Sequence, residues 1–195
     1  MAKKQAVKVI VKKKRWVTVI APKIFNEREI GEMHVENPQS AVGRKMTVSM
    51  MTLTGEPRKQ NIMVKFLISG FIGEKLQTEM IGYSMNTAAT KRMMRRNRSK
   101  LDDSLVYKTA DDKKIRIKPL IVTRGRTQGG TKAAIRKLMK EHLANTIVKM
   151  QYENLLREII QGKFQRTMQD FLRKTHPIAA AEVRNIELIV PKKRA

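Results

Sequence analysis

Residues 43–71 read GRKMTVSMMTLTGEPRKQNIMVKFLISGF, and this stretch indicates the class of the fold most directly. Apolar and polar residues alternate before and after Gly55-Glu56-Pro57, with the period of two that is typical of half-buried β-strands. The alternating apolar residues are Met46, Val48 and Met50 before this segment, and Ile62, Val64, Phe66 and Ile68 after it. Because glycine and proline favour turns, we expect strands over 44–53 and 61–71, joined as an antiparallel hairpin or meander.

More strands are expected on both sides of this hairpin. Residues 16–20 are β-branched and aromatic, which favours a strand. Residues 105–109 and 115–121 form a second predicted hairpin, with its turn at Asp111-Asp112. A final strand is expected over 183–190.

Helices are expected between the hairpins and through most of the last third of the chain. The first covers Thr87–Leu101, with Asn86 or Thr87 as its N-cap. Apolar residues then recur at intervals of three and four over 133–150, 152–160 and 164–172. The sequence therefore predicts an α+β fold, in which three to four helices, mostly in the C-terminal third, pack on a mainly antiparallel β-sheet or barrel-like core.

One domain is expected over residues 1–195, because the sequence contains no internal repeat and no long linker rich in Pro, Gly or Ser. Basic extensions are expected at its two ends, over 1–14 and 191–195. The helix over 152–160 is the least basic element, and we expect it to face a core or a protein neighbour.

The chain is strongly and evenly basic. It has 42 Lys and Arg against 17 Asp and Glu, a net charge of +25, and each third contains the same number of basic residues. Charge of one sign repels itself in a folded protein, and a polyanion neutralises it. Nucleic-acid phosphate is the commonest such partner, because a cation placed on a phosphate releases condensed counterions. The composition therefore predicts a nucleic-acid-binding protein that touches its partner on several sides.

Four groups of basic residues are the candidate RNA contacts. The first group precedes Trp16, which could stack on a base but which we expect to pack inward as part of a strand. The second group gathers on one face of the predicted helix 87–101, without an acid to balance it. The third lies in the loop before the next helix and the fourth at the C-terminus. The residues are Lys12, Lys13, Lys14 and Arg15; Lys91, Arg92, Arg95, Arg96 and Arg98; Arg124, Arg126 and Lys132; and Lys192, Lys193 and Arg194.

The loop TRGRTQGGTK, residues 123–132, is close to a P-loop without matching one. A P-loop has Gly, four residues and then Gly-Lys-Ser/Thr. Gly125 and Gly130 have that spacing, but Thr131-Lys132 stand in the reverse order. We expect instead a flexible loop whose arginines and glycine N–H groups hold backbone phosphates, as the N-terminus of the following helix does.

A catalytic constellation cannot be assembled from the sequence. His34, His142 and His176 lack metal-ligand spacing, and we expect His142 to be a core histidine on an apolar helix face. The acids Asp102-Asp103 and Asp111-Asp112 fall where a helix end and a hairpin turn are expected, and local hydrogen bonds explain them. The chain has no cysteine, which removes thiol nucleophiles and thiolate metal sites. We expect neither an enzyme nor a cofactor.

The sequence predicts a cytoplasmic protein. It contains no apolar run of the roughly 18 to 20 residues needed to cross a bilayer. The N-terminus does not have the pattern of a secretory signal, because Lys12 to Arg15 interrupt its apolar residues.

Five segments, in their order and spacing, resemble a known family. They are RWVTVIAPKIFNEREIG (15–31), GRKMTVSMMTL (43–53), KTADDKKIRIKPLIV (108–122), TRGRTQGGTKAAIRKLM (123–139) and HPIAAAEVRNIELIVPKK (176–193). Over nearly its whole length the chain resembles the S-three-Ae, or eukaryotic-type S-one, family of small-subunit ribosomal proteins. Archaea and eukaryotes share this family, and the compact chain is similar to the archaeal form.

The resemblance implies a β-barrel-like core with packed helices on the platform of the small ribosomal subunit. It also implies contacts with small-subunit rRNA near its 3′ end and with neighbouring platform proteins, close to where mRNA exits. We therefore expect a structural rRNA-binding protein that acts by phosphate neutralisation and shape fit. Two alternatives remain open. One is a sequence-tolerant DNA- or RNA-compacting protein, which the charge alone allows equally well, and the other is an RNA-processing enzyme.

Overall fold

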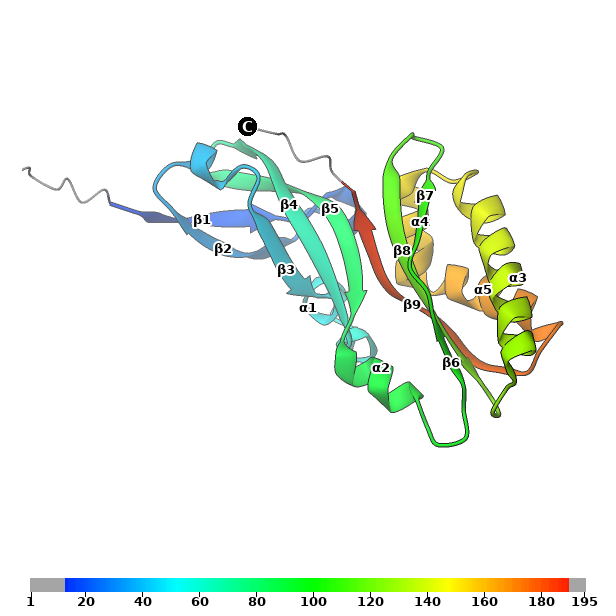
Figure 1. Cartoon of the computed structure of the whole chain (residues 1–195). Coiled ribbons are helices and arrows are strands. Elements are labelled where there is room, and N and C mark those ends of the chain that lie inside the picture. Colours follow the sequence, from blue (N-terminus) through cyan, green and yellow to red (C-terminus); the bar gives the residue numbers. More distant parts are fainter. Residues whose placement is uncertain (1–12, 190–195) are drawn as a thin grey trace, which may run out of the picture. The chain divides into compact units, whose positions relative to one another are not determined.

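The computed structural model describes residues 13–189 (Figure 1). In this part of the chain there are nine β-strands, five α-helices and three short 3-10 segments. The strands are β1 Arg15–Ile20, β2 Glu29–Val35, β3 Lys45–Ser49, β4 Ile62–Ile72, β5 Lys75–Met85, β6 Lys100–Asp102, β7 Leu105–Lys108, β8 Lys114–Thr123 and β9 Ile178–Leu188. The helices are α1 Met50–Thr54, α2 Thr87–Met93, α3 Gly129–Ile147, α4 Tyr152–Gln161 and α5 Lys163–Arg173.

The described chain divides into two compact units. The first unit contains residues 13–46 and Leu67–Glu79, and the second contains Thr47–Phe66 and residues 80–189. Strands β3, β4 and β5 each supply residues to both units.

The first unit is built around β1. This strand pairs antiparallel with β2 along its length, and it pairs parallel with β5 where Val19 lies beside Leu76. Val17 and Val19 are buried because alternate residues of a strand point to the same face. The Thr78 hydroxyl of β5 donates a 2.7 Å hydrogen bond to the Ile20 carbonyl, which joins β5 to the end of β1.

The sheet of the second unit has β8 and β9 at its centre. They pair antiparallel from Ile115 beside Leu188 to Thr123 beside Ile178. A bulge follows Lys118, where Pro119 has no N–H to donate to the ladder. Strands β6 and β7 both pair with β8, and β5 pairs antiparallel with β9 through Gly82, Tyr83 and Ser84.

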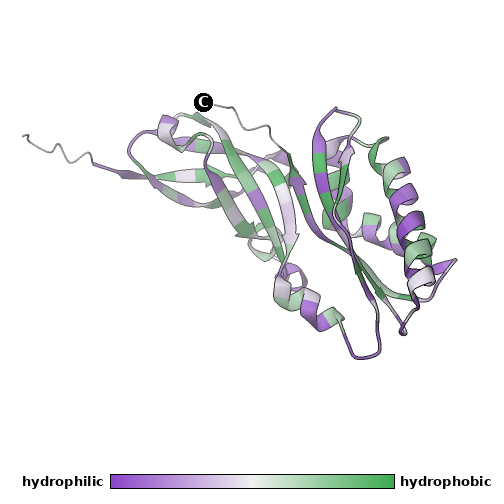
Figure 2. Ribbon diagram, in the orientation of Figure 1, coloured by the Kyte–Doolittle hydropathy of each residue, from purple (hydrophilic) through white to green (hydrophobic). Residues whose placement is uncertain are grey.

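The three C-terminal helices pack together beside this sheet (Figure 1). Helix α5 packs on β9, α3 and α4 contact α5, and α3 also contacts β7. Their buried apolar residues are Ile135, Met139, Leu143 and Ile147 in α3, Tyr152, Leu155, Leu156 and Ile159 in α4, and Phe164, Met168 and Leu172 in α5. Figure 2 shows both hydrophilic and hydrophobic residues around α3, as expected for a helix with one buried face. The apolar side of α4 therefore forms part of a core, which is one of the two roles expected for 152–160.

The predicted α+β class is confirmed. The strands are mostly antiparallel and the sheet is open, and the hairpin predicted over 105–121 is present as β7 and β8. Helices α3, α4 and α5 lie where the apolar periodicity placed them, although α3 begins at Gly129 rather than at 133. The final strand, β9, begins at Ile178 and is longer than the predicted 183–190.

Two predicted boundaries are wrong. The strand expected over 44–53 ends at Ser49, and α1 follows it and is closed by Gly55 at φ 76°, a left-handed conformation that glycine adopts readily. The helix expected over 87–101 ends at Met93. There the chain becomes extended and turns through Asn97 at φ 61°, so that β6 can pair with β8 and bury Leu101.

Strands β2 and β5 were not predicted. In β5 the residues Leu76, Thr78 and Met80 are buried, whereas Gln77 and Glu79 are exposed. This alternation is the usual signal of a strand, and it was available in the sequence.

Candidate nucleic-acid interface

The candidate basic residues fall in three parts of the chain. Lys12, Lys192, Lys193 and Arg194 lie outside the described residues. Lys13, Lys14 and Arg15 are exposed in the first unit, immediately before β1 and at its first residue. The remaining eight lie in the second unit, and all are exposed except Lys132, which is half-buried. They are Lys91, Arg92, Arg95, Arg96, Arg98, Arg124, Arg126 and Lys132.

Hydroxyl groups join the two loops of the second unit that contain most of these cations. The loops are residues 94–99, between α2 and β6, and residues 124–128, between β8 and α3. The Ser99 N–H donates to Thr123 Oγ1 at 3.0 Å, and the Thr127 N–H donates to Ser99 Oγ at 3.0 Å. The Thr123 hydroxyl in turn donates to the Gly125 carbonyl at 2.6 Å. Because Ser99 and Thr123 are both buried, this contact holds the two loops against each other.

The strand register extends into these loops. Lys100 lies beside Val122 in the β6–β8 ladder, and the Thr123 N–H donates to the Ser99 carbonyl at 3.0 Å. The next residues outward are Arg98 and Arg124. Two basic groups that are distant in the sequence therefore meet at one end of the second unit (Figure 1). We refer to Arg95, Arg96, Arg98, Arg124 and Arg126 as the paired-loop arginines.

Helix α2 leads into this site. The predicted N-cap is confirmed, since Asn86 Oδ1 accepts a hydrogen bond from the Ala88 N–H at 3.2 Å. Lys91 and Arg92 are exposed on α2, and the Arg92 guanidinium donates to Asn61 Oδ1 at 2.7 Å. Because the helix ends at Met93, only these two of the five predicted cations lie on a helix, and the other three follow in the loop.

The start of α3 adds backbone N–H groups to the site. The helix begins at Gly129, and the side chain of its N-cap residue, Gln128, makes no capping hydrogen bond. The first N–H groups of a helix have no partner within it, and they favour anions. The phosphate-holding role expected for residues 123–132 stays a prediction, and Gly129 and Gly130 of this segment belong to the helix rather than to the loop.

The two carboxylates that follow the 94–99 loop in the sequence, Asp102 and Asp103, are paired with other cations. Asp102 accepts from Arg184 at 2.6 Å and lies 2.9 Å from Lys100, and Asp103 lies 3.2 Å from Arg136. The prediction that these acids sit at a helix end is therefore wrong, because Asp102 is the last residue of β6, Asp103 follows it, and both pair with cations of neighbouring residues. Within residues 13–189, no ion pair involves any paired-loop arginine, nor the three other cations near them, Lys91, Arg92 and Lys132.

The acids of the β7–β8 turn have two different roles. Asp112 is in the turn at φ 56°, and its N–H donates to the Thr109 carbonyl at 3.0 Å, as local hydrogen bonding predicted. Asp111 Oδ2 instead accepts from the Tyr152 N–H at 3.0 Å. A carboxylate at this position stabilises the N-terminus of α4, so the local explanation is wrong for Asp111.

Trp16 is exposed, contrary to the inward packing expected for it. Its side chain is 66% exposed, and its ring stacks on that of His34 with centroids 4.8 Å apart. Val17 and Val19 take the buried face of β1, so the alternation of the strand directs Trp16 to the opposite face. The neighbouring Arg15 guanidinium donates to Glu74 at 2.8 Å.

His34 lies in the first unit, whereas His142 and His176 lie in the second. His142 is half-buried against Phe171, with ring centroids 4.7 Å apart, and burial lowers the pKa of its imidazole. In the part of the chain that the structure describes, no three His, Cys, Asp or Glu residues are close enough to hold a metal ion.

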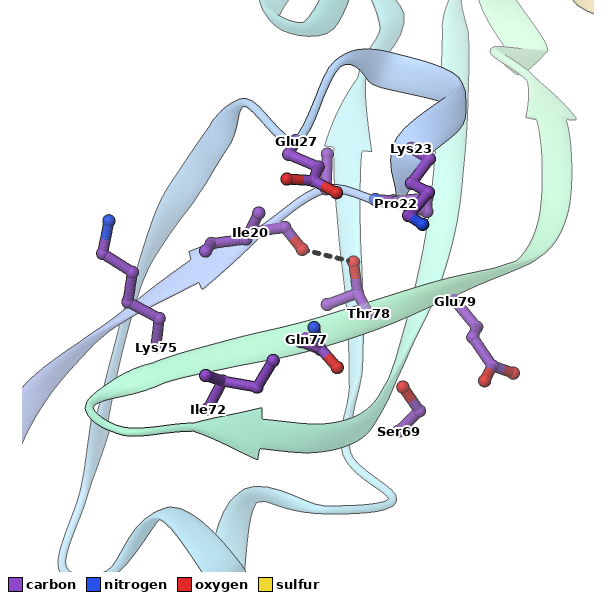
Figure 3. A pocket seen from close by; sticks show the side chains of 11 residues that line it. Ile20, Pro22, Lys23, Glu27, Ser69, Ile72, Lys75, Gln77, Thr78 and Glu79 are labelled. Carbon is purple, nitrogen blue, oxygen red and sulfur yellow. Dashed lines mark hydrogen bonds between the residues drawn. The ribbon is translucent and has the colours of Figure 1, made fainter.

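A pocket of about 360 Å³ lies in the first unit (Figure 3). Charges of both signs line it, since Lys23 and Lys75 as well as Glu27 and Glu79 are among the residues around it. Acidic side chains repel phosphate, so the paired loops of the second unit are the better candidate for phosphate binding. Between residues 13 and 189, no helix is long and apolar enough to span a membrane.

Comparisons with known proteins agree with one another. The sequence model described as the Ribosomal S3Ae family matches residues 2–191. Small ribosomal subunit protein eS1 of Methanobrevibacter smithii is 31% identical over 172 residues, which is 88% of this chain and 89% of that protein. The protein of the same name from Methanothermobacter thermautotrophicus is 29% identical over 182 residues, 93% of each chain. That from Saccharolobus solfataricus is 26% identical over 188 residues, 96% of this chain and 90% of the relative.

Proposed function

The chain belongs to the ribosomal S3Ae family, and from this premise we propose that it binds small-subunit rRNA near its 3′ end, on the platform of the subunit. In this proposal the paired-loop arginines neutralise phosphates of folded rRNA, and the surface around them fits its shape. Folded RNA is recognised mostly through shape, phosphates and 2′-hydroxyl groups rather than by reading base pairs in a groove.

The protein is a structural constituent of the small ribosomal subunit and not an enzyme. It acts in the cytoplasm as part of the ribosome, and its relatives are the archaeal proteins named above. Within the subunit it associates with rRNA and with other ribosomal proteins.

One observation supports the proposed mode of binding above the others. Five arginines converge on two hydroxyl-linked loops, while the nearby carboxylates form ion pairs with other cations. Arginines held together without a carboxylate repel one another, so the site is stabilised by a polyanion. Guanidinium groups suit this role, because their fork of N–H donors can bind two phosphate oxygens at once.

We propose that neighbouring platform proteins contact this chain within the subunit, and that the mRNA exit lies nearby. The apolar faces of α4 and α5 are buried in the second unit, so protein contacts there would use the polar faces of these helices.

Crosslinking within purified small subunits tests the proposed site. We expect rRNA nucleotides near the 3′ end to crosslink to peptides that contain Arg95–Arg98 or Arg124–Arg126. The protein should also sediment with small subunits at moderate salt. Recovery of the protein only in the free pool, or crosslinks from these loops only to protein, would contradict the proposal.

Changing the hydroxyl link without changing charge gives a second prediction. The variant Ser99→Ala/Thr123→Val leaves the buried Ser99 N–H and the partly buried Thr127 N–H without acceptors, and a buried group left unpaired costs about 1 to 3 kcal/mol. We expect the two loops to be held together less tightly, although the backbone bond from Thr123 to the Ser99 carbonyl remains. The affinity for rRNA should then fall severalfold, as measured by filter binding. The dependence of affinity on salt should stay the same, because no cation is lost.

A matched control for this variant is Thr146→Val, which removes a hydroxyl that donates to the His142 carbonyl at 2.8 Å within α3. Its affinity should equal that of the wild type. A double variant that binds rRNA as well as the control does would show that the link does not position the arginines.

A further inference from the structure

Trp16 and His34 form an exposed aromatic pair that the proposed rRNA contacts in the second unit do not use. The two residues lie opposite each other on β1 and β2, which run side by side (Figure 1). Their rings stack with centroids 4.8 Å apart and planes 28° apart. The imidazole covers only part of the indole, since Trp16 remains 66% exposed.

An indole this exposed leaves a large apolar surface in contact with water. Burying apolar surface is favourable, and tryptophan has the largest aromatic surface of the common side chains. Contact with His34 holds the indole in one orientation, and a ring that is already ordered loses less entropy when a ligand stacks on it. The pair is therefore a preformed platform for a flat aromatic group.

Basic residues beside the platform indicate the class of ligand. Lys13 and Lys14 are exposed, three and two residues before Trp16. An unpaired nucleotide matches both features, because its base can stack on the indole while neighbouring phosphates contact the lysines. The bases of duplex RNA are covered by their neighbours in the stack and cannot reach the platform.

The acids near the platform are consistent with this arrangement. Glu32 lies opposite Thr18, farther along β1 than Trp16 and on the side away from the lysines. Glu36 follows β2 on the lysine side and has an interaction partner of its own. We therefore expect the phosphates of the bound RNA strand to lie on the side of the platform where Lys13 and Lys14 are.

We propose that Trp16 and His34 bind an unpaired base of RNA by stacking, with Lys13 and Lys14 at the adjacent phosphates. This inference rests on the proposed function, because it takes RNA as the ligand of the chain. It adds a site in the first unit that recognises single-stranded RNA, separate from the phosphate contacts of the paired-loop arginines.

Intrinsic fluorescence of the purified full chain tests this site directly, because Trp16 is the only tryptophan. An oligouridylate of about eight nucleotides, a length within the usual range of single-strand binding sites, should quench the indole emission. An RNA duplex with the same number of phosphates should bind without quenching it. In a fluorescence anisotropy assay with labelled oligouridylate, Trp16→Ala should bind about tenfold or more weakly, whereas Trp16→Phe, which keeps a ring, should retain most of the affinity.

Three results would overturn the inference: no quenching by oligouridylate, equal quenching by the duplex, or unchanged affinity of Trp16→Ala. Thermal unfolding of each variant checks that it is folded, which we expect because Trp16 is exposed. The same preparation is also tested with folded small-subunit rRNA. If wild type binds that rRNA but oligouridylate does not quench, the stacking site is wrong and the proposed function stands. If it binds neither RNA, the proposed function itself fails.

Crosslinking in purified small subunits, with and without added mRNA, identifies the source of the base. A crosslink from the Trp16 peptide to an unpaired rRNA nucleotide, or to mRNA only when mRNA is added, supports the proposal. A crosslink from this peptide only to a protein would overturn it.

Discussion

Replacing Arg95, Arg96 and Arg98 together with alanine is expected to weaken binding to small-subunit rRNA about a hundredfold near 0.1 M salt. Each cation placed on a phosphate releases counterions, and each such contact adds about 0.7 to 0.9 to the slope of log affinity against log salt concentration. Three lost contacts should therefore lower the magnitude of that slope by about two to three. No ion pair within residues 13–189 involves these arginines, so removing them leaves no described carboxylate unpaired.

Counterion release also determines how the rRNA affinity of the wild-type protein depends on salt. If about six to ten phosphates are contacted, affinity should fall by roughly a thousandfold or more between 50 and 200 mM salt. Filter binding or anisotropy at several salt concentrations measures both the affinity and the slope. The two quantities together separate lost phosphate contacts from a general loss of folding, because a misfolded fraction lowers the apparent amount of active protein without altering the slope.

A control variant with the same change in net charge is Arg157→Ala/Lys163→Ala/Arg166→Ala. These exposed cations lie on α4 and α5, away from the paired loops in the sequence. Their removal should change affinity far less. Equal losses in the two triple variants would mean that binding depends on net charge alone, and the paired loops would not be a site.

Replacing Gly82 with alanine is expected to destabilise the second unit strongly. A Cβ atom at this position would lie 2.8 Å from the Ile186 carbonyl oxygen, closer than such atoms approach in proteins. Since that oxygen belongs to the backbone of β9, the β5–β9 ladder would have to move apart. Overpacking of this kind costs about 1 to 3 kcal/mol, and for a chain of this size each kcal/mol lowers Tm by about 2 to 4 °C.

Thermal unfolding followed by circular dichroism measures this effect, with Gly70→Ala as the matched control. Gly70 also lies within a strand, β4, but nothing comes within 4 Å of a Cβ built there. We expect its Tm to be close to that of the wild type. A Gly82→Ala protein that unfolds at the wild-type temperature would show that β5 and β9 do not approach as closely as the structure places them.

The sequence predicts correctly those features that depend on the residues of a single helix or hairpin. Apolar residues spaced three and four apart identified α3, α4 and α5, because such residues share one face of a helix whatever that face contacts. The β7–β8 hairpin was also recognisable, since its strands are adjacent in sequence and Asp111-Asp112 favour a turn. The even excess of positive charge pointed to a polyanionic partner, because charge is a property of composition and not of fold.

The end of α2 could not be predicted from local periodicity. Met93, Met94 and Leu101 share an apolar arc on a continuous helix, which favoured a helix up to Leu101. An extended chain after Met93 is more stable than a continued helix, because β6 can then form a ladder with β8 and Leu101 is buried. That gain depends on a strand about twenty residues away, so only Asn97, which tolerates the left-handed conformation of a turn, gave a local signal.

The sequence by itself therefore determined the α+β class, the C-terminal helices, the family and the need for a polyanionic partner. Only the tertiary structure decided which cations lie together, because the Ser99–Thr123 contact joins loops from two parts of the chain and ion pairs depend on distance. It likewise decided that Trp16 faces outward, since Val17 and Val19 complete the core on the other face of β1. The physical reason is common to both cases. Periodicity along the chain defines the faces of each element, whereas contacts between distant elements decide which face is buried and which charges remain unpaired.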